Sequence, residues 1–292
     1  MPPEAPNKEL LLVGLQETGK TSFLALFYLT VVHDEGLLGL ASFQNDREHL
    51  NRISRRLMEC EAAVHTRVAE KGSLLLSLEV KATGEPVELR IPDLSGETWE
   101  EAVEQRLWTE SVDQQVRQSD AVLVFMAADK LDAGVTKGDA DHAAKELGVE
   151  VPASKPQRNN PEAKQVKMKG KPPTQVQLVD LLQLTVEQRG KRPARACIMI
   201  SAWDTQPSES TPREFIRNSM PLLDQYLQAN ADWLTVSVFG VSAQGGSFLD
   251  DEERKQLATQ DPHKRAFILG QGGEQVPIGT PVEWVLGLDG GS

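Results

Sequence analysis

A loop able to hold phosphate groups lies near the start of the sequence. Residues 14–21 read Gly-Leu-Gln-Glu-Thr-Gly-Lys-Thr and match G-x-x-x-x-G-K-[ST] in full, between an apolar run and a helical run. Glycines let such a backbone wrap closely, so its N–H groups point at phosphate oxygens, and the following helix adds positive potential. Lys20 is expected to reach the β- and γ-phosphates, and the Thr21 hydroxyl to ligate Mg²⁺. The nucleotide contacts predicted here are Gly14, Gln16, Glu17, Thr18, Gly19, Lys20, Thr21 and Ser22.

A second motif follows another apolar run. Residues 91–97 read Ile-Pro-Asp-Leu-Ser-Gly-Glu. A phosphate site of this kind needs a carboxylate at a neighbouring strand end, which holds Mg²⁺ through water, and a glycine whose N–H meets the γ-phosphate. Asp93 and Gly96 have the spacing for these two roles. Asp and Gly are also common in turns, so the position of the motif, downstream of a complete phosphate loop, is what favours the functional interpretation.

The elements that must position these residues follow from the apolar pattern. Six runs are typical of strands, and two of them flank a turn at residues 82–86 that predicts a hairpin. Strands that are apolar on both faces belong in the middle of a sheet covered by helices. The six predicted strands are residues 9–13, 74–80, 87–91, 121–127, 196–200 and 235–241.

Helical patterns fill the gaps between these strands. The predicted helices are residues 21–32, 46–64, 97–118, 175–188 and 212–228. The last follows Thr-Pro-Arg-Glu at 211–214, a capping box with proline at the first helical position. This alternation predicts an α/β protein with the three-layer P-loop NTPase fold. We expect a mostly parallel six-stranded sheet with one antiparallel strand and helical insertions.

We expect a single domain over residues 1–292. Residues 34–66 form a helical insertion with the first switch region in this interpretation, and residues 265–292 a C-terminal extension. Residues 151–173 hold five prolines and six Lys or Arg but one acid. Such a segment cannot form a packed core and is predicted to be a disordered loop.

Composition limits the classes of partner. The 292 residues carry a formal net charge of −12, which argues against a nucleic-acid-binding protein because the positive charge that neutralises phosphates is lacking. The longest apolar run near the N-terminus, residues 23–32, is too short to cross a membrane. With only two cysteines a disulfide framework is not expected, so we predict a cytoplasmic protein without membrane partners.

The two phosphate motifs, in this order, resemble those of the translation-factor and Ras-like class of P-loop GTPases. The resemblance implies two base-recognition motifs further along. Residues 201–204 read Ser-Ala-Trp-Asp where such GTPases usually carry N-K-x-D, which puts Asp204 in place of the aspartate that binds guanine. Ser201 and Ala202 depart from that pattern. Ser242, Ala243 and Gln244 resemble the S-A-K loop, whose backbone contacts the guanine oxygen.

The same resemblance implies a switch. Thr66, just before the second strand, is the residue best placed to close over Mg²⁺, with Thr21 and Asp93 as the other metal-binding side chains. Glu97 stands where many relatives have a glutamine that orients the attacking water, and a carboxylate there can accept a proton from the water. The predicted catalytic residues are therefore Lys20, Glu97 and Thr66. Glu97 can also be a first-turn acid favoured by the helix dipole.

Three further features narrow the resemblance to the bacterial double-GTPase families. They are the long insertion before the second strand, the helix that carries Trp99, and the ending Pro-Val-Glu-Trp-Val-Leu at 281–286. These families are often associated with conflict or antiviral defence operons, which implies a partner protein from the same operon. Because the sequence has one P-loop, a second GTPase would be a separate subunit.

The expected function is a GTP-binding and GTP-hydrolysing switch that uses Mg²⁺, binds GTP and GDP, and acts on a partner protein. Two alternatives stay open on the sequence. One is a pseudo-GTPase that holds nucleotide without useful turnover, because Glu97 and the base motif are altered. The other is an ATPase, because Ala202 replaces the usual lysine.

Overall fold

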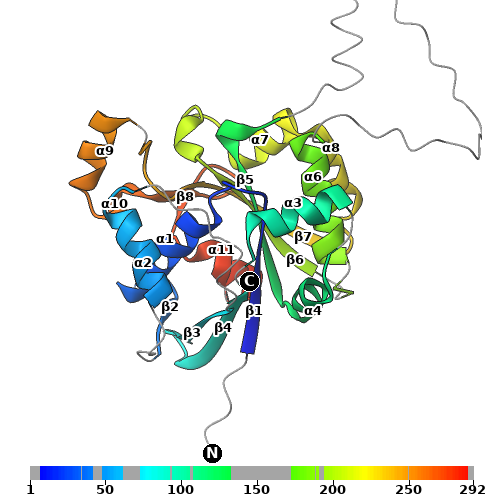
Figure 1. Ribbon diagram of the computed structural model, residues 1–292, viewed down its shortest axis with the longest axis horizontal. Helices are drawn as coiled ribbons and strands as arrows, with labels where there is room; N and C mark the ends of the chain where they lie inside the picture. The colour runs from blue at the N-terminus through cyan, green and yellow to red at the C-terminus, as the bar shows by residue number, and fades with distance from the viewer. Residues whose placement is uncertain are drawn as a thin grey trace, which may run out of the picture.

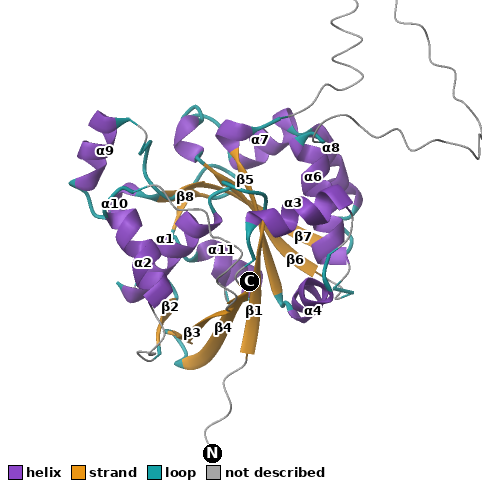
Figure 2. Ribbon diagram, in the orientation of Figure 1, coloured by secondary structure: helices purple, strands orange, loops and turns teal. Residues whose placement is uncertain are grey.

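The computed structural model describes residues 7–33, 35–41, 48–61, 73–92, 94–105, 108–132, 172–187, 189–190, 194–248 and 250–288. Within these residues, nine strands form one sheet in the order β2-β3-β4-β1-β5-β6-β7-β8-β9, and helices cover both of its faces (Figures 1 and 2). The strands are β1 (Asn7–Val13), β2 (Leu38–Leu40), β3 (Ser73–Val80), β4 (Glu85–Pro92), β5 (Ala121–Ala127), β6 (Ala194–Ser201), β7 (Leu234–Ser242), β8 (Phe267–Leu269) and β9 (Gln275–Val276).

The middle of the sheet is parallel, because β4, β1, β5, β6 and β7 pair in that sense. Alternate side chains of each strand enter different cores. In β1, Leu10 and Leu12 join the apolar cluster on one face, whereas Leu11 and Val13 join the cluster on the other. A strand buried on both faces needs a continuous apolar run, which explains why the sequence pattern locates the central strands.

All six predicted strands are present, and β3 pairs with β4 in the antiparallel sense, as the predicted hairpin requires. The prediction of one antiparallel strand is wrong, because β8 also runs antiparallel to β7. The predicted total of six strands is wrong, because β2, β8 and β9 extend the sheet at its edges. These three strands contain two or three residues each. Runs this short contain too little alternation to be recognised as strands from sequence.

The helices divide between the two faces of the sheet (Figure 1). Side chains of α1, α2 and α11 contribute to one cluster, and those of α3, α4, α6, α7 and α8 contribute to the other. Among the described residues, no helix is both long and apolar enough to cross a membrane. The helices are α1 (Lys20–Val32), α2 (Glu48–Met58), α3 (Gly96–Gln105), α4 (Glu110–Gln118), α6 (Thr174–Leu182), α7 (Pro212–Ser219), α8 (Pro221–Ala229), α9 (Asp251–Ala258), α10 (Pro262–Arg265) and α11 (Thr280–Leu286).

Two predicted helices are each divided in the structure. The segment 97–118 contains α3 and α4, and the Thr109 side chain caps α4 by accepting a hydrogen bond from the Val112 amide. The segment 212–228 contains α7 and α8, which meet at Met220. Pro221 follows, and proline disfavours helical conformation in the residue before it, so a new helix starts there. The N-cap half of the predicted capping box is confirmed, because the Glu214 amide donates to the Thr211 hydroxyl.

A buried arginine ties the helical insertion to the C-terminal part of the chain. The Arg265 guanidinium donates to the carbonyl oxygens of Leu57 and Leu257, at the ends of α2 and α9, and lies over the Phe248 ring. A Cβ on Gly245 would lie 2.6 Å from the Arg265 carbonyl oxygen. The Arg265 contacts therefore reach from α2 to the loop that follows β7.

Candidate functional site

The predicted phosphate loop joins β1 to α1 at the carboxyl end of the sheet. Two of its glycines are required by the crowding of neighbouring strands. A Cβ on Gly14 would lie 2.7 Å from the Phe125 carbonyl oxygen, and one on Gly19 would lie 2.8 Å from the Ser201 Cβ. Gly19 also has a φ of +85°, in the left-handed region that favours glycine. The ends of β5 and β6 thus enclose this loop.

Lys20 points its side chain back into the loop. Its Nζ donates to the carbonyl oxygens of Gly14 and Leu15, both at 2.6 Å. Burial lowers the pKa of Lys20 to about 8, and the negative charge of Glu100 acts in the opposite direction. The Lys20 ammonium is half-buried, and it also donates to the Thr18 hydroxyl at 3.4 Å, so its hydrogen-bond partners are neutral oxygens. Such a group is well suited to an anionic ligand, because phosphate oxygens would stabilise its charge.

The other loop residues form the rim and the first helical turn. Thr18 is buried and its hydroxyl donates to the Leu15 carbonyl oxygen at 2.9 Å, whereas Gln16 and Glu17 are exposed. Thr21 and Ser22 are half-buried in the first turn of α1, which carries no acidic residue. The positive end of the helix dipole is therefore not offset by a carboxylate within that turn.

The second motif lies directly against this loop. A Cβ on Gly96 would lie 2.6 Å from both the Cα and the amide nitrogen of Gln16. The parallel pairing of β4 with β1 places the start of α3 there. The two phosphate motifs, 82 residues apart from Gly14 to Gly96, thus meet in space. Asp93 and Thr66 lie outside the described residues.

The acids of α3 differ in their surroundings. Glu97 is exposed, while Glu100 is half-buried and accepts a hydrogen bond from Gln16 Nε2 at 3.3 Å. The sequence predicts Glu97 because it follows Gly96 directly. Glu100 belongs to neither motif, although a spacing of four residues from Gly96 puts both on one side of a helix.

The two predicted base-recognition segments also meet. The Ser242 hydroxyl donates to Asp204 Oδ1 at 2.6 Å, and the Gly245 amide donates to the Ser242 hydroxyl at 3.1 Å. Ser242 and Ala243 are buried, whereas Gln244 is half-buried. Asp204 is exposed, so one of its carboxylate oxygens is fixed by Ser242 while the side chain stays open to solvent.

The sequence profile of the Double-GTPase 1 family matches residues 11–285. This chain belongs to the Double-GTPase 1 family. The resemblance inferred from the motifs is thereby confirmed. No curated protein matches the chain. Among solved structures, the crystal structure of Sup35 complexed with GDP matches with 12% sequence identity and a TM-score of 0.36, covering 84% of this chain and 39% of that one.

In this double-GTPase, the structure shows the surroundings of the residues that replace N-K-x in the N-K-x-D pattern. Ser201 packs against Gly19 and its hydroxyl donates to the Met126 carbonyl oxygen at 3.1 Å. Ala202 has a φ of +53°, the left-handed conformation. Trp203 is buried, and a Cβ on Gly240 would lie 2.4 Å from its ring. Trp203 is therefore a core residue.

A cation that sequence reasoning missed reaches the P-loop of the double-GTPase. Lys130, at the end of a 3-10 helix (Ala128–Lys130) after β5, forms an ion pair with Glu17. Glu17 has a φ of +56°, which is uncommon for a residue other than glycine. The helix of Lys130 packs on the one that contains Asp204 (Trp203–Thr205). Lys130 thus links the P-loop to the segment that contains Asp204.

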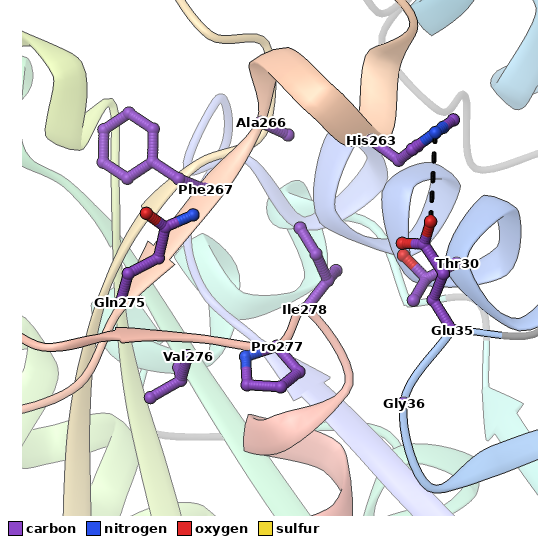
Figure 3. A pocket seen from close by; sticks show the side chains of 10 residues that line it. All are labelled: Thr30, Glu35, Gly36, His263, Ala266, Phe267, Gln275, Val276, Pro277 and Ile278. Atoms are coloured by element: carbon purple, nitrogen blue, oxygen red, sulfur yellow. Dashed lines mark ion pairs between the residues drawn. The ribbon is translucent and has the colours of Figure 1, made fainter.

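A cavity of about 410 Å³ lies away from this site (Figure 3). Its lining includes Thr30, ten residues after Lys20 on α1, which is about 15 Å along the helix. Figure 3 shows Glu35 and His263 on one side, with Glu35 Oε1 3.9 Å from His263 Nε2, and Phe267 on the other. The cavity is therefore separate from the P-loop.

Proposed function

We propose that this double-GTPase chain binds GTP and hydrolyses it to GDP and phosphate. The observation that carries the proposal is the contact of Gly96 with Gln16, because it joins a complete P-loop to a D-x-x-G segment. The Lys20 ammonium, half-buried inside the same loop, supplies a positive charge for the triphosphate. Backbone amides, a lysine and a helix N-terminus are the recurring parts of such a phosphate site.

Each residue has a defined role in this proposal. Phosphate oxygens replace the carbonyl oxygens of Gly14 and Leu15 as partners of Lys20, and the Gly96 amide donates to the γ-phosphate. Thr21 offers a hydroxyl oxygen, a ligand that Mg²⁺ accepts, and Asp93 is the proposed carboxylate. When bound, Mg²⁺ would neutralise charge that develops on the phosphates.

Base recognition is assigned to Asp204 together with the loop of Ser242, Ala243 and Gln244. The Ser242 hydroxyl holds one carboxylate oxygen of Asp204, which supports a fixed orientation of that side chain. If Asp204 accepts hydrogen bonds from guanine, Asp204→Asn should shift preference from guanosine toward xanthosine nucleotides. Xanthine has an oxygen acceptor in place of the 2-amino donor of guanine, so the amide N–H of asparagine can donate to it. Competition binding with both nucleotides measures this shift. Unchanged preference contradicts the assignment.

The cellular role in this proposal is a switch. The γ-phosphate orders the segment around Gly96 together with Thr66, and hydrolysis releases both, which changes affinity for a partner protein. The partner in this proposal is a second GTPase subunit within a bacterial defence system. This step is tested by measuring whether the partner binds the chain when it holds GTP and not when it holds GDP.

The activity is tested by multiple-turnover phosphate release from GTP in Mg²⁺, with Lys20→Ala as the control for contaminating enzymes. We expect release by the wild type and loss of release in the variant. Tight GTP binding without release would favour the pseudo-GTPase alternative. Equal displacement of labelled GTP by ATP and by GTP would exclude guanine specificity and favour the ATPase alternative.

A further inference from the structure

The face of α3 that touches the P-loop carries a specific acid. Gly96 contacts the loop backbone, and Glu100 lies one turn further along on the same face because residues four apart are neighbours on a helix. Trp99, Ala102 and Val103 are buried on the face that packs into the core. This packing fixes the rotation of α3, so the direction in which Glu100 faces is determined by the core.

Glu100 also interacts with the loop through its side chain. Its Oε2 accepts from Gln16 Nε2 at 3.3 Å, and its negative charge raises the pKa of Lys20 against the effect of burial. Glu97 and Glu101 are exposed. Among the described acids of α3, Glu100 therefore contacts the phosphate loop, whereas Glu97 and Glu101 face solvent.

We propose that Glu100, rather than Glu97, is the catalytic carboxylate that accepts the proton of the attacking water. The proposal rests on the GTP hydrolysis proposed above. The water oxygen forms a bond to the γ-phosphorus while one water proton moves to Glu100. The bond from the γ-phosphorus to the β–γ bridging oxygen breaks, GDP leaves with that electron pair, and the proton then passes to the released phosphate or to solvent. Oxidation states do not change.

The contact with Gln16 of the P-loop holds the Glu100 carboxylate in a position where it can act as a general base. An exposed carboxylate on a helix surface has no fixed direction, whereas Gln16 and the packed α3 hold Glu100 beside the loop that contains Lys20. A base must lie within hydrogen-bond reach of its proton before its pKa matters.

The test is single-turnover hydrolysis of GTP in Mg²⁺, with GTP affinity measured in parallel. Glu100→Gln keeps the size of the side chain and an acceptor for Gln16 but removes the base. We expect its hydrolysis rate to fall about 100-fold or more, the usual contribution of a general base, while GTP affinity changes by less than about threefold. Glu101→Gln, on the exposed face of the same helix, is the matched control and should hydrolyse GTP at the wild-type rate.

Chemical rescue separates a base from a structural residue. In Glu100→Ala, added formate should restore hydrolysis by about tenfold, because a small carboxylate can take the vacated place as proton acceptor. A Glu100→Gln variant that hydrolyses GTP at the wild-type rate overturns the assignment. So does a Glu97→Gln variant that loses hydrolysis while Glu100→Gln keeps it. A wild-type protein that binds GTP without any turnover overturns the proposed hydrolysis together with this role.

Discussion

The contact of Gly96 with the P-loop gives a sharp prediction. In Gly96→Ala the new methyl carbon would lie 2.6 Å from two backbone atoms of Gln16. Carbon atoms prefer a separation of about 3.5–4.0 Å, so α3 and the loop must move apart by about 1 Å. No side-chain rotation can relieve the clash, because the neighbouring atoms belong to the backbone.

The loss of nucleotide affinity in Gly96→Ala should depend on whether the nucleotide has a γ-phosphate. If the Gly96 amide donates to that group, a displacement of about 1 Å removes a charge-assisted hydrogen bond, which contributes about 1.5–3 kcal/mol. We therefore expect GTP affinity to fall by roughly 10- to 100-fold and GDP affinity to stay within about threefold. Crowding also costs stability, by about 1–3 kcal/mol. Calorimetric titration with the two nucleotides measures the difference.

Gly272→Ala is the matched control. Its added Cβ would meet Glu274 Oε2 at 2.8 Å, at the end of an exposed and flexible side chain that can move away. The control should bind both nucleotides as the wild type does. If Gly96→Ala loses GDP and GTP affinity equally, or loses neither, then Gly96 does not sense the γ-phosphate and the proposed switch is wrong.

Three other results are expected. Raising the pH above about 8 should weaken GTP binding, by about tenfold at pH 9, because free Lys20 must first be protonated; a Lys20→Met variant should lose this dependence in titrations across pH. The exposed Glu17–Lys130 pair should show a coupling of about 0.2–1 kcal/mol in a double-mutant cycle on GTP affinity, and 0.5 M salt should reduce it. Arg265→Met should lower the free energy of unfolding by about 2–4 kcal/mol in urea, because carbonyls at the ends of α2 and α9 lose a buried donor; a loss below about 0.5 kcal/mol would contradict this.

The fold could be predicted from sequence where burial leaves a continuous signal. Central strands such as β5 are apolar throughout because both faces are covered. The edge strands lack that requirement, and β9 has only two residues. Helix ends were located less well, since the apolar periodicity continues across the break at Pro221 while the backbone does not.

The site shows the same division between local and tertiary information. The P-loop, Gly96, Asp204 and Ser242 follow strand ends, and the carboxyl ends of parallel strands meet at one edge of a sheet. Their assembly was therefore predictable. Glu100 carries no motif, and its relation to Gln16 depends on how Trp99 seats α3 in the core.

Tertiary packing brings to the P-loop a lysine that lies outside the predicted base motif. At position 202 the family pattern of GTPases carries lysine, while this chain has alanine in a left-handed conformation. A cation nevertheless reaches the loop apex, because Lys130 extends from the end of β5 to Glu17. Since β5 and β6 are adjacent parallel strands, their ends border the same loop. A positive charge beside Glu17 can therefore come from the end of β5 or from the end of β6. The amino acid at position 202 alone does not determine whether the P-loop has this charge.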